Sequence, residues 1–360
     1  MLLKVYQKYI IKNFFITFFK ITFVFISLGF VVGILEELNF FSEIDTDYFT
    51  LMILVLLNLP TLIYEIFPFI FLITSQFFFL NILENGELNT FKNKGLSNFK
   101  IIQIVCFSSF LFGLFVITFF YQFSSSMKFH YLDIKKNFTK DNKYLAAVTE
   151  NGLWIKDSYD GKINFINSKK FSLNSLEEVQ IIVLDKEFNF IKNIQSKKVE
   201  IKDNNWKLNN VKIIDNNNNV FEEKTMKFYS NFNYEEINNF FSNLSAQSIL
   251  ELLELIQNYN AINYSTIEIE YHIQKIIAYP FLIMIITLLS SIIMLNIKHQ
   301  RPKFFTIILG ILFSVIIYYI NFLFGTLGKN EKIPLLIAVW SPQIILIMIS
   351  LIGLIRINEK

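Results

Sequence analysis

Long apolar segments alternate with short polar ones along the chain. A helix needs about 20 apolar residues to cross the hydrocarbon of a bilayer. Six windows qualify, three before a long polar middle and three after it, at roughly 13–35, 52–82, 101–122, 276–297, 304–324 and 334–355. The pattern therefore predicts six transmembrane helices. Pro60 and Pro68 fall inside the second window and predict a kink there.

The polar middle has a different period. Between about 143 and 232, short segments alternate apolar and polar residues, as half-buried strands do. The segment "GLWIKDSYDGKINFIN" predicts a hairpin with a type I′ turn at Asp160-Gly161, and "KKVEIKDNNWKLNNVKII" predicts a second hairpin that turns at Asp203, Asn204 and Asn205. With "EVQIIVLD" and "FNFIKNI" as further strands, we expect an all-β sandwich or open jelly roll of roughly six to nine strands.

An amphipathic helix is expected after the strands. The segment "SAQSILELLELIQNY" spaces Ile249, Leu252, Leu253 and Ile256 along one helix face, and Ser245 is its candidate N-cap. The helix would lead back toward the fourth membrane helix. The expected organisation is three transmembrane helices in 1–122, the β-domain with this helix in 123–270, and three further transmembrane helices in 271–360.

Basic residues indicate the orientation, because Lys and Arg of short loops are retained on the cytoplasmic side. They lie in the N-terminal segment, in the loops after the second and fourth windows and in the tail, at Lys4, Lys8, Lys12, Lys92, Lys94, Lys100, Lys298, Arg301, Lys303, Arg356 and Lys360. The segment after the first window instead carries Glu36, Glu37, Glu43, Asp45 and Asp47. We expect both termini in the cytoplasm and residues 123–270 outside it.

Composition agrees with a membrane protein and limits the chemistry. The mean hydropathy of +0.43 and the 42 Phe exceed what one soluble core would bury, and the net charge of +3 gives no argument for nucleic acid. The single Cys106 forms no internal disulfide. His130, His272 and His299 lie far apart, and neither a GxxxxGK[ST] phosphate loop nor a Gly-x-Ser-x-Gly elbow occurs. We expect a non-catalytic chain without metal or cofactor, driven by another subunit or an ion gradient.

Glu65 is the ionisable residue that stands out, since it lies inside the second window between two prolines. Such a residue is costly in hydrocarbon unless it has a function. It is either a proton or cation site, or its segment is tipped toward the outer interface. The two halves of the chain lack the matched broken helices of ion-coupled carriers with inverted repeats.

The short loop "LENGELNTFKNKGLSNFK" lies between the second and third windows, and its residues 84–100 face the cytoplasm in this topology. Helix-forming Glu84, Glu87, Leu88 and Lys92 precede Gly95 as a stop, which predicts a short amphipathic helix. Leu88 and Phe91 would then seat in a groove of a soluble partner while the carboxylates pair with basic residues around it. An ordinary solvated connector is the alternative.

Several segments together resemble one protein family. "LPTLIYEIFPF" followed by "ENGELNTFKNKGLSNFKI" resembles the signature of the LptF/LptG lipopolysaccharide-export permeases, and the matching positions are Pro60, Pro68, Glu87, Leu88, Gly95 and Ser97. The segments "ENGLWIKD", "WKLNNV", "YHIQKIIAYPF" and "IPLLIAVWSPQIIL" follow in the family's order, so the resemblance covers nearly the whole chain. The "GLW" segment favours the LptG branch, while "AVWSP" also resembles LptF.

The resemblance implies a partner for each missing function. Such permeases work as a heterodimer in the bacterial inner membrane, on a dimer of cytoplasmic ABC ATPases that binds the ATP. They pass lipopolysaccharide to periplasmic jellyroll proteins of the LptC/LptA type. By this resemblance, Glu84, Glu87, Leu88, Phe91 and Gly95 couple the permease to the ATPase. Spans one and five line the substrate cavity, with candidate wall residues Phe25, Phe30, Glu36, Glu37, Ile320 and Phe324.

The chain departs from the family at the outer end of span one. LptG proteins commonly carry basic residues there, whereas no Lys or Arg occurs between Lys20 and Lys92 and the end reads "GILEELNFF". Glu36 and Glu37 would repel a phosphorylated head group unless divalent cations bridge them. Two alternatives therefore stay open: an ABC-type permease for another lipid or lipoprotein, and a membrane sensor with a β-ectodomain.

Overall fold

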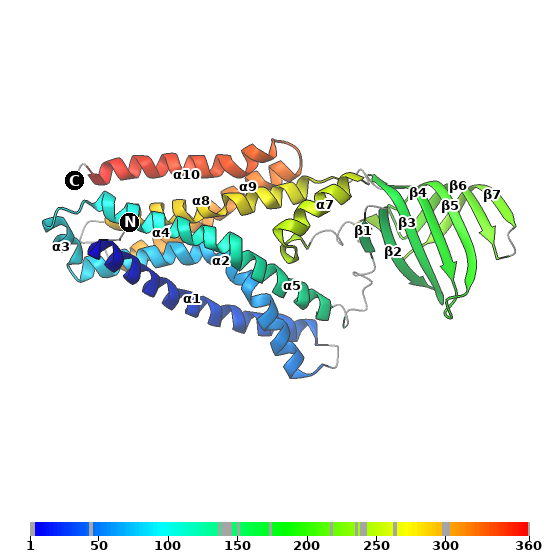
Figure 1. Ribbon diagram of the computed structural model, residues 1–360, viewed down its shortest axis with the longest axis horizontal. Helices are drawn as coiled ribbons and strands as arrows, with labels where there is room; N and C mark the ends of the chain where they lie inside the picture. Colours follow the sequence, from blue (N-terminus) through cyan, green and yellow to red (C-terminus); the bar gives the residue numbers. More distant parts are fainter. Residues whose placement is uncertain are drawn as a thin grey trace. The chain divides into compact units, whose positions relative to one another are not determined.

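The computed structural model describes residues 4–42, 46–135, 138, 146–149, 152–172, 175–216, 219–234, 237, 243–261, 265–296 and 303–358. The chain divides into two compact units. Met1–Lys128 and Glu270–Lys360 form the membrane unit, and Phe129–Ile269 form the β unit. Figure 1 shows the long helices of the first and the strands of the second.

Six helices in the described part of the chain are long and apolar enough to cross a membrane, which confirms the prediction from hydropathy. The third is made of α4, the π-helix η1 and α5, and the short helix α3 precedes it. The elements are α1 (Val5–Phe40), α2 (Tyr48–Glu84), α3 (Glu87–Asn93), α4 (Asn98–Phe115), η1 (Val116–Phe120), α5 (Tyr121–Lys135), α8 (Ile267–Leu295), α9 (Lys303–Lys329) and α10 (Leu335–Asn358). Helix α2 continues through Pro60 and Pro68.

Phenylalanine rings fill the core of the membrane unit. The Phe18 ring centroid lies 4.8 Å from the centroids of both Phe71 and Phe112, which joins α1, α2 and α4. Gly113 of α4 lies against Pro280 of α8, so closely that a Cβ on Gly113 would come within 2.7 Å of the Pro280 Cα atom. Aromatic packing and close glycine contacts therefore hold these helices together.

The third membrane helix is interrupted where α4 gives way to the five π-helical residues of η1. A π-helical turn changes the direction in which the following side chains point. Just after it, the Tyr121 hydroxyl lies 3.0 Å from Nε2 of His272 on α8. Further along α5, Lys128 Nζ donates a hydrogen bond of 2.7 Å to Asn58 Oδ1 on α2. Polar side chains that follow the interruption therefore contact α2 and α8.

The β unit contains one antiparallel sheet whose seven described strands follow in chain order. They are β1 (Ala146–Thr149), β2 (Gly152–Tyr159), β3 (Lys162–Ser172), β4 (Ser175–Leu184), β5 (Phe190–Glu200), β6 (Asn205–Asp215) and β7 (Val220–Tyr229). An all-β domain between the third and fourth membrane helices is therefore confirmed. The sequential order is that of a meander, whereas a jelly roll would add Greek-key connections.

Both predicted hairpins are present. Asp160 and Gly161 join β2 to β3 with φ angles of 50° and 72°, the left-handed values that a type I′ turn requires. The second hairpin joins β5 to β6 and turns just before Asn205, the first residue of β6. The Asp-Gly dipeptide and the Asn-rich segment were thus sufficient signals for these turns.

One face of the sheet is apolar and the other polar. Ile155, Ile166, Ile181 and Ile194 stand opposite one another on successive strands and are all nearly fully buried. On the opposite face, Asn167, Gln180, Gln195, Lys212 and Glu222 form the corresponding row across β3 to β7. Trp206 closes one end of the apolar side, where its Nε1 donates a hydrogen bond of 2.6 Å to the carbonyl of Phe232.

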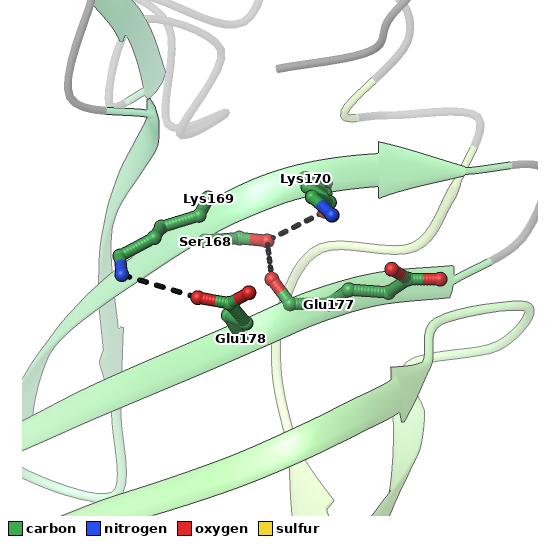
Figure 2. A network of polar contacts seen from close by, with 5 residues as sticks. All are labelled: Ser168, Lys169, Lys170, Glu177 and Glu178. Atoms are coloured by element: carbon green, nitrogen blue, oxygen red, sulfur yellow. Dashed lines mark hydrogen bonds and ion pairs between the residues drawn. The ribbon is translucent and has the colours of Figure 1, made fainter. Parts of the chain in front are cut away.

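A line of irregular residues crosses the sheet, and we call it the crease. Between β3 and β4, Lys169 and Glu178 do not pair in the strand register, and Glu178 has a φ of 51°. The buried Ser168 hydroxyl donates to the carbonyl oxygens of Lys170 (2.8 Å) and Glu177 (2.9 Å), and the Lys169 and Glu178 side chains form an ion pair of 3.1 Å on the other face (Figure 2). The same arrangement recurs between β5 and β6, where the Ser196 hydroxyl donates to the carbonyl oxygens of Lys198 and Asn209.

The predicted amphipathic helix is α7 (Ile249–Ala261). Its N-terminus lies at Ser248 rather than at the expected Ser245, which belongs to a short 3-10 helix, Leu244–Ala246. Ser248 Oγ accepts a hydrogen bond from the backbone N–H of Glu251, and the Glu251 carboxylate accepts one from the backbone N–H of Ser248. Two serines three residues apart offer the same N-cap signal, and the glutamate that completes the capping box selects the second.

Candidate functional site

The segment between α2 and α4 forms a short helix, as predicted, with different bounds. Helix α2 continues through Glu84, so this carboxylate ends α2 and does not begin α3. Gly86 then takes a left-handed φ of 66°, which allows the chain to turn before Glu87. At the other end Gly95 has a φ of 79°, and the Ser97 side chain accepts a hydrogen bond from the backbone N–H of Lys100 to cap α4.

Helix α3 is held against the first turns of α1. The Tyr9 hydroxyl donates a hydrogen bond of 3.0 Å to Glu87 Oε1. The Tyr9 ring also meets Phe91 edge to face, with centroids 6.2 Å apart. Two contacts from Tyr9 therefore tie Glu87 and Phe91 of α3 to α1.

Leu88 was predicted to seat in a groove of a soluble partner, but its side chain faces the membrane unit. It is 8% exposed and packs into the core of the membrane unit, and Leu96 just after the helix is likewise buried. Phe91 is partly buried against the same core. Because α3 turns its apolar side inward, Leu88 anchors the helix, and Asn89, Lys92 and Asn93 form the exposed polar side.

A groove of about 620 Å³ runs between α3 and the start of α1, and we call it the α3 groove. It is lined by Lys4, Val5, Tyr6, Tyr9, Glu87, Thr90, Phe91, Lys94, Gly95, Leu96 and Lys100. Glu87 is its acidic residue, while three lysines from three different segments make it basic overall. Such a groove suits a partner that presents carboxylates around one hydrogen-bond donor for Glu87.

Helices α1 and α9 pack least against the rest of the membrane unit. Only 17% of the apolar window of α1 and 11% of that of α9 are buried, against 61% for α8. The most exposed apolar side chains there include Phe19, Phe23, Leu312, Val315 and Tyr318. Faces this apolar and this open are suited to lipid or to another membrane helix.

The six candidate wall residues fall on these two helices but differ in exposure. Phe25 contacts Phe69 of α2, with ring centroids 5.6 Å apart, and like Phe30, Ile320 and Phe324 it is only partly exposed. Glu36 is exposed, whereas its neighbour Glu37 is 2% exposed. Their role as a cavity wall stays a prediction.

Glu65 lies in a second pocket of the membrane unit, of about 450 Å³, between α2, α8, α9 and α10. We call it the Lys275 pocket, because Lys275 lines it together with Glu65, Lys329, Tyr64, Tyr271, Tyr279, Gln343 and mostly apolar neighbours. Sequence reasoning singled out Glu65 but missed both lysines. It also missed Tyr9, because no local pattern signals contacts that form only between distant segments.

The part of the chain that the structure describes contains no group of three or more His, Cys, Asp or Glu side chains that could hold a metal ion. Cys106 is buried within the membrane unit.

Comparison with known protein families gives a match. The family described as "Lipopolysaccharide export system permease LptF/LptG" matches residues 8–356, nearly the whole chain. No curated protein sequence matches the chain. The matched range contains the α3 groove from Tyr9 onward, the β unit and nearly the full length of the described membrane helices.

Proposed function

The chain belongs to the LptF/LptG family of lipopolysaccharide export permeases, and from this premise we propose that it is the membrane subunit through which an ATP-driven complex extracts lipopolysaccharide from the bacterial inner membrane. The chain lacks a phosphate-binding loop, so ATP would be bound and hydrolysed by a separate dimer of ABC-type ATPases. The subunit itself would be non-catalytic and hold no cofactor.

One observation carries the mechanical part of this proposal. Tyr9 joins α3 to α1, and α1 is a helix with a largely open apolar face. An ATPase that pushes on the exposed side of α3 would therefore move α1 directly. Leu88 and Leu96 keep α3 seated on the membrane unit, so the push would not simply detach the helix.

The open faces of α1 and α9 suggest where the partner permease and the lipid lie. A homologous second permease would complete a heterodimer, with these two helices of each subunit enclosing the lipid. Acyl chains favour such apolar walls, whereas a closed helical bundle would bury them. We favour the LptG branch for this chain because of the "GLW" segment.

The β unit would receive the lipid outside the cytoplasm. Its sheet has one apolar face, and β7 lies at one end of the described strand order, with polar and aromatic side chains exposed along it. A periplasmic jellyroll protein of the LptC/LptA type could continue the sheet at such an edge. Both termini and α3 would then lie in the cytoplasm, an orientation that the lysines around the α3 groove support.

A permease for a different lipid is the second candidate, because Glu36 is exposed at the end of α1 and would face a head group. One experiment separates the two. The complete complex in proteoliposomes is loaded with lipopolysaccharide or with a lipoprotein, and ATP-dependent release to a soluble jellyroll acceptor is measured. Release of lipopolysaccharide alone supports the proposal, and release of lipoprotein alone refutes it.

A further inference from the structure

The apolar face of the β-sheet, where the proposed function brings the lipid, is covered in this structure. Ile155, Ile181 and Ile194 lie on three different strands, and each is at most 1% exposed. An acyl chain needs direct contact with such side chains, because its binding depends on the apolar surface that both remove from water. A lipid can therefore reach this face only when some part of the chain that covers it moves away.

The segment that follows β7 provides part of this cover, and we call it the strap: residues 230–234 together with Ile237. Phe232 is 2% exposed and Ile237 is 0% exposed. Both belong to the same buried apolar cluster as the isoleucines of the sheet, and Tyr234 packs against that cluster. Two large apolar side chains of the strap thus occupy the core that an acyl chain would have to enter.

The strap is held to the sheet at separate points. The backbone N–H of Ser230 donates a hydrogen bond of 2.9 Å to the carbonyl of Asn204. The backbone N–H of Tyr234 donates one of 2.9 Å to the carbonyl of Ile201. Strands β3 to β6, by contrast, pair with a neighbouring strand on both sides. A segment held by scattered bonds opens at a lower free energy than strands inside a ladder, so the strap is the part of the cover that can move.

Asn231 joins the strap to Asp157 of β2, and we call this contact the latch. Asn231 Nδ2 donates a hydrogen bond of 2.8 Å to Asp157 Oδ1 and one of 2.9 Å to the carbonyl of Ser158. The backbone N–H of Asn231 donates to Asp157 Oδ2 at 3.2 Å. Beside the latch, the ring centroids of Tyr159 and Tyr229 are 4.2 Å apart. The latch therefore ties the end of β2 to the end of β7, although four strands separate them in the order of the sheet.

The chemistry of the latch allows it to open. The Asp157 side chain is 0% exposed, and both groups of Asn231 that donate to it are uncharged. A carboxylate buried in this way gives up much of its hydration. Water that reaches Asp157 after the strap leaves would replace the lost hydrogen bonds. The closed state then depends mainly on the packing of Phe232 and Ile237, which a bound acyl chain can replace.

We propose that the strap is a built-in plug of the lipid site, which covers the apolar face when no lipid is bound and which an acyl chain displaces by taking the place of Phe232 and Ile237. Asp157 and Asn231 set how readily this exchange occurs. The inference rests on the proposed function, which assigns the acyl chains to this face. It adds that lipid enters by exchange with residues of the chain itself.

The first test locks the strap in the full-length chain held in amphipol. In Asp157→Cys/Asn231→Cys, a disulfide would tie the strap to β2, and a reductant would release it in the same protein. Trp154→Phe and Trp340→Phe leave Trp206 as the sole tryptophan. Trp206 donates from Nε1 to the strap, so dibrominated stearate that displaces the strap should quench its fluorescence. We expect quenching in the reduced protein and binding on the order of tenfold weaker in the oxidised protein, because only the open fraction binds.

The second test needs no cysteines and follows the strap by hydrogen exchange. Stearate should speed the exchange of the amides of residues 230–234 while the amides of β4 and β5 stay protected, because the lipid displaces the strap and leaves the strands paired. A strap with a purely structural role would exchange at the same rate or more slowly when stearate binds.

A third measurement compares two asparagine variants. Asn231→Ala should bind stearate severalfold more tightly than the wild type, since it destabilises only the closed state. Asn189→Ala removes the same kind of contact, a side-chain hydrogen bond of 3.0 Å to Asp185, from the β4–β5 turn. It should bind stearate as the wild type does.

Three results would overturn the inference: equal quenching of Trp206 in the oxidised and reduced forms of the locked protein, exchange of residues 230–234 that stearate slows or leaves unchanged, or unchanged affinity in Asn231→Ala. A failed proposed function would look different. The complete complex would then release no lipopolysaccharide on ATP hydrolysis, while stearate still displaced the strap.

Discussion

The contact between Tyr9 and Glu87 is the sharpest place to test how α3 moves α1. Tyr9→Phe removes the hydroxyl and keeps the ring that packs on Phe91, so it deletes the 3.0 Å hydrogen bond alone. A hydrogen bond to a charged group contributes ~1.5–3 kcal/mol when buried. Tyr9 is 43% exposed, and solvent screening reduces the expected value to about 1 kcal/mol, a factor of roughly five.

The assay compares ATP hydrolysed with lipopolysaccharide released in proteoliposomes that hold the complete complex. We expect Tyr9→Phe to lower the released lipid per ATP severalfold while the ATPase still co-purifies. Glu87→Ala should also weaken co-purification of the ATPase, because it removes the carboxylate that would pair with a charged group of the ATPase. Removing one member of a desolvated charge pair costs ~2–5 kcal/mol. Tyr6→Phe makes the same chemical change on a tyrosine that lines the same groove, and should behave as the wild type.

A double-mutant cycle decides whether the bond itself is responsible. If Tyr9 acts through Glu87, then Tyr9→Phe adds nothing to the loss of coupling already caused by Glu87→Ala. Fully additive effects of the two changes would refute the reasoning. So would a Tyr9→Phe variant whose ratio of lipid to ATP equals that of the wild type.

Three further predictions follow from the described geometry. Leu88→Ala should destabilise the seating of α3 by about 2–3 kcal/mol, seen as faster proteolysis of the segment around Gly86 in the purified chain; unchanged cleavage would contradict the anchor role. A cysteine at the exposed Glu187 should react with an impermeant thiol reagent in cells whose outer barrier is removed, and one at Asn93 should not; the reverse pattern would invert the proposed topology. Hydrogen bonds from the side chain and backbone of Asn189 lower the pKa of Asp185 in the folded protein. The β4–β5 turn therefore has this stability above the pKa of Asp185 in the unfolded chain and loses it as the pH falls through the lower pKa of the folded state. Asn189→Ala should raise the folded-state pKa of Asp185 in a carboxyl NMR titration, and an unchanged titration curve would exclude Asn189 as the cause.

Local patterns predicted the elements well, because each element depends on its own residues. Apolar windows located all six membrane helices, and Asp160-Gly161 located a hairpin from two residues that tolerate positive φ. The ends of the elements were less predictable. Helix α5 continues to Lys135, beyond the window that ends near 122, and in this extension Lys128 bonds to Asn58 of α2.

The sites could be predicted only in part. Glu65 and Glu87 stand out in the sequence by position or by resemblance, yet their partners do not. Tyr9 is an ordinary residue of an apolar helix until α3 folds onto it, and Lys275 looks like the flank of a membrane span. The predicted direction of the Leu88 side chain was wrong for a related reason. A seven-residue helix has too few positions for its pattern of apolar residues to show which face packs against the membrane unit.

The membrane unit consists of two stretches of chain separated by the β unit, and this sets an order of events during synthesis. At ~5–20 residues per second, synthesis of the roughly 140 residues of Phe129–Ile269 occupies the ribosome for about 7 to 28 s after Lys128 has been added. Throughout that interval Gly113 has no Pro280 to pack on, and Tyr121 has no His272. The nascent first half must therefore wait in the bilayer with polar groups uncovered, a stage at which an insertase or a membrane chaperone could hold it.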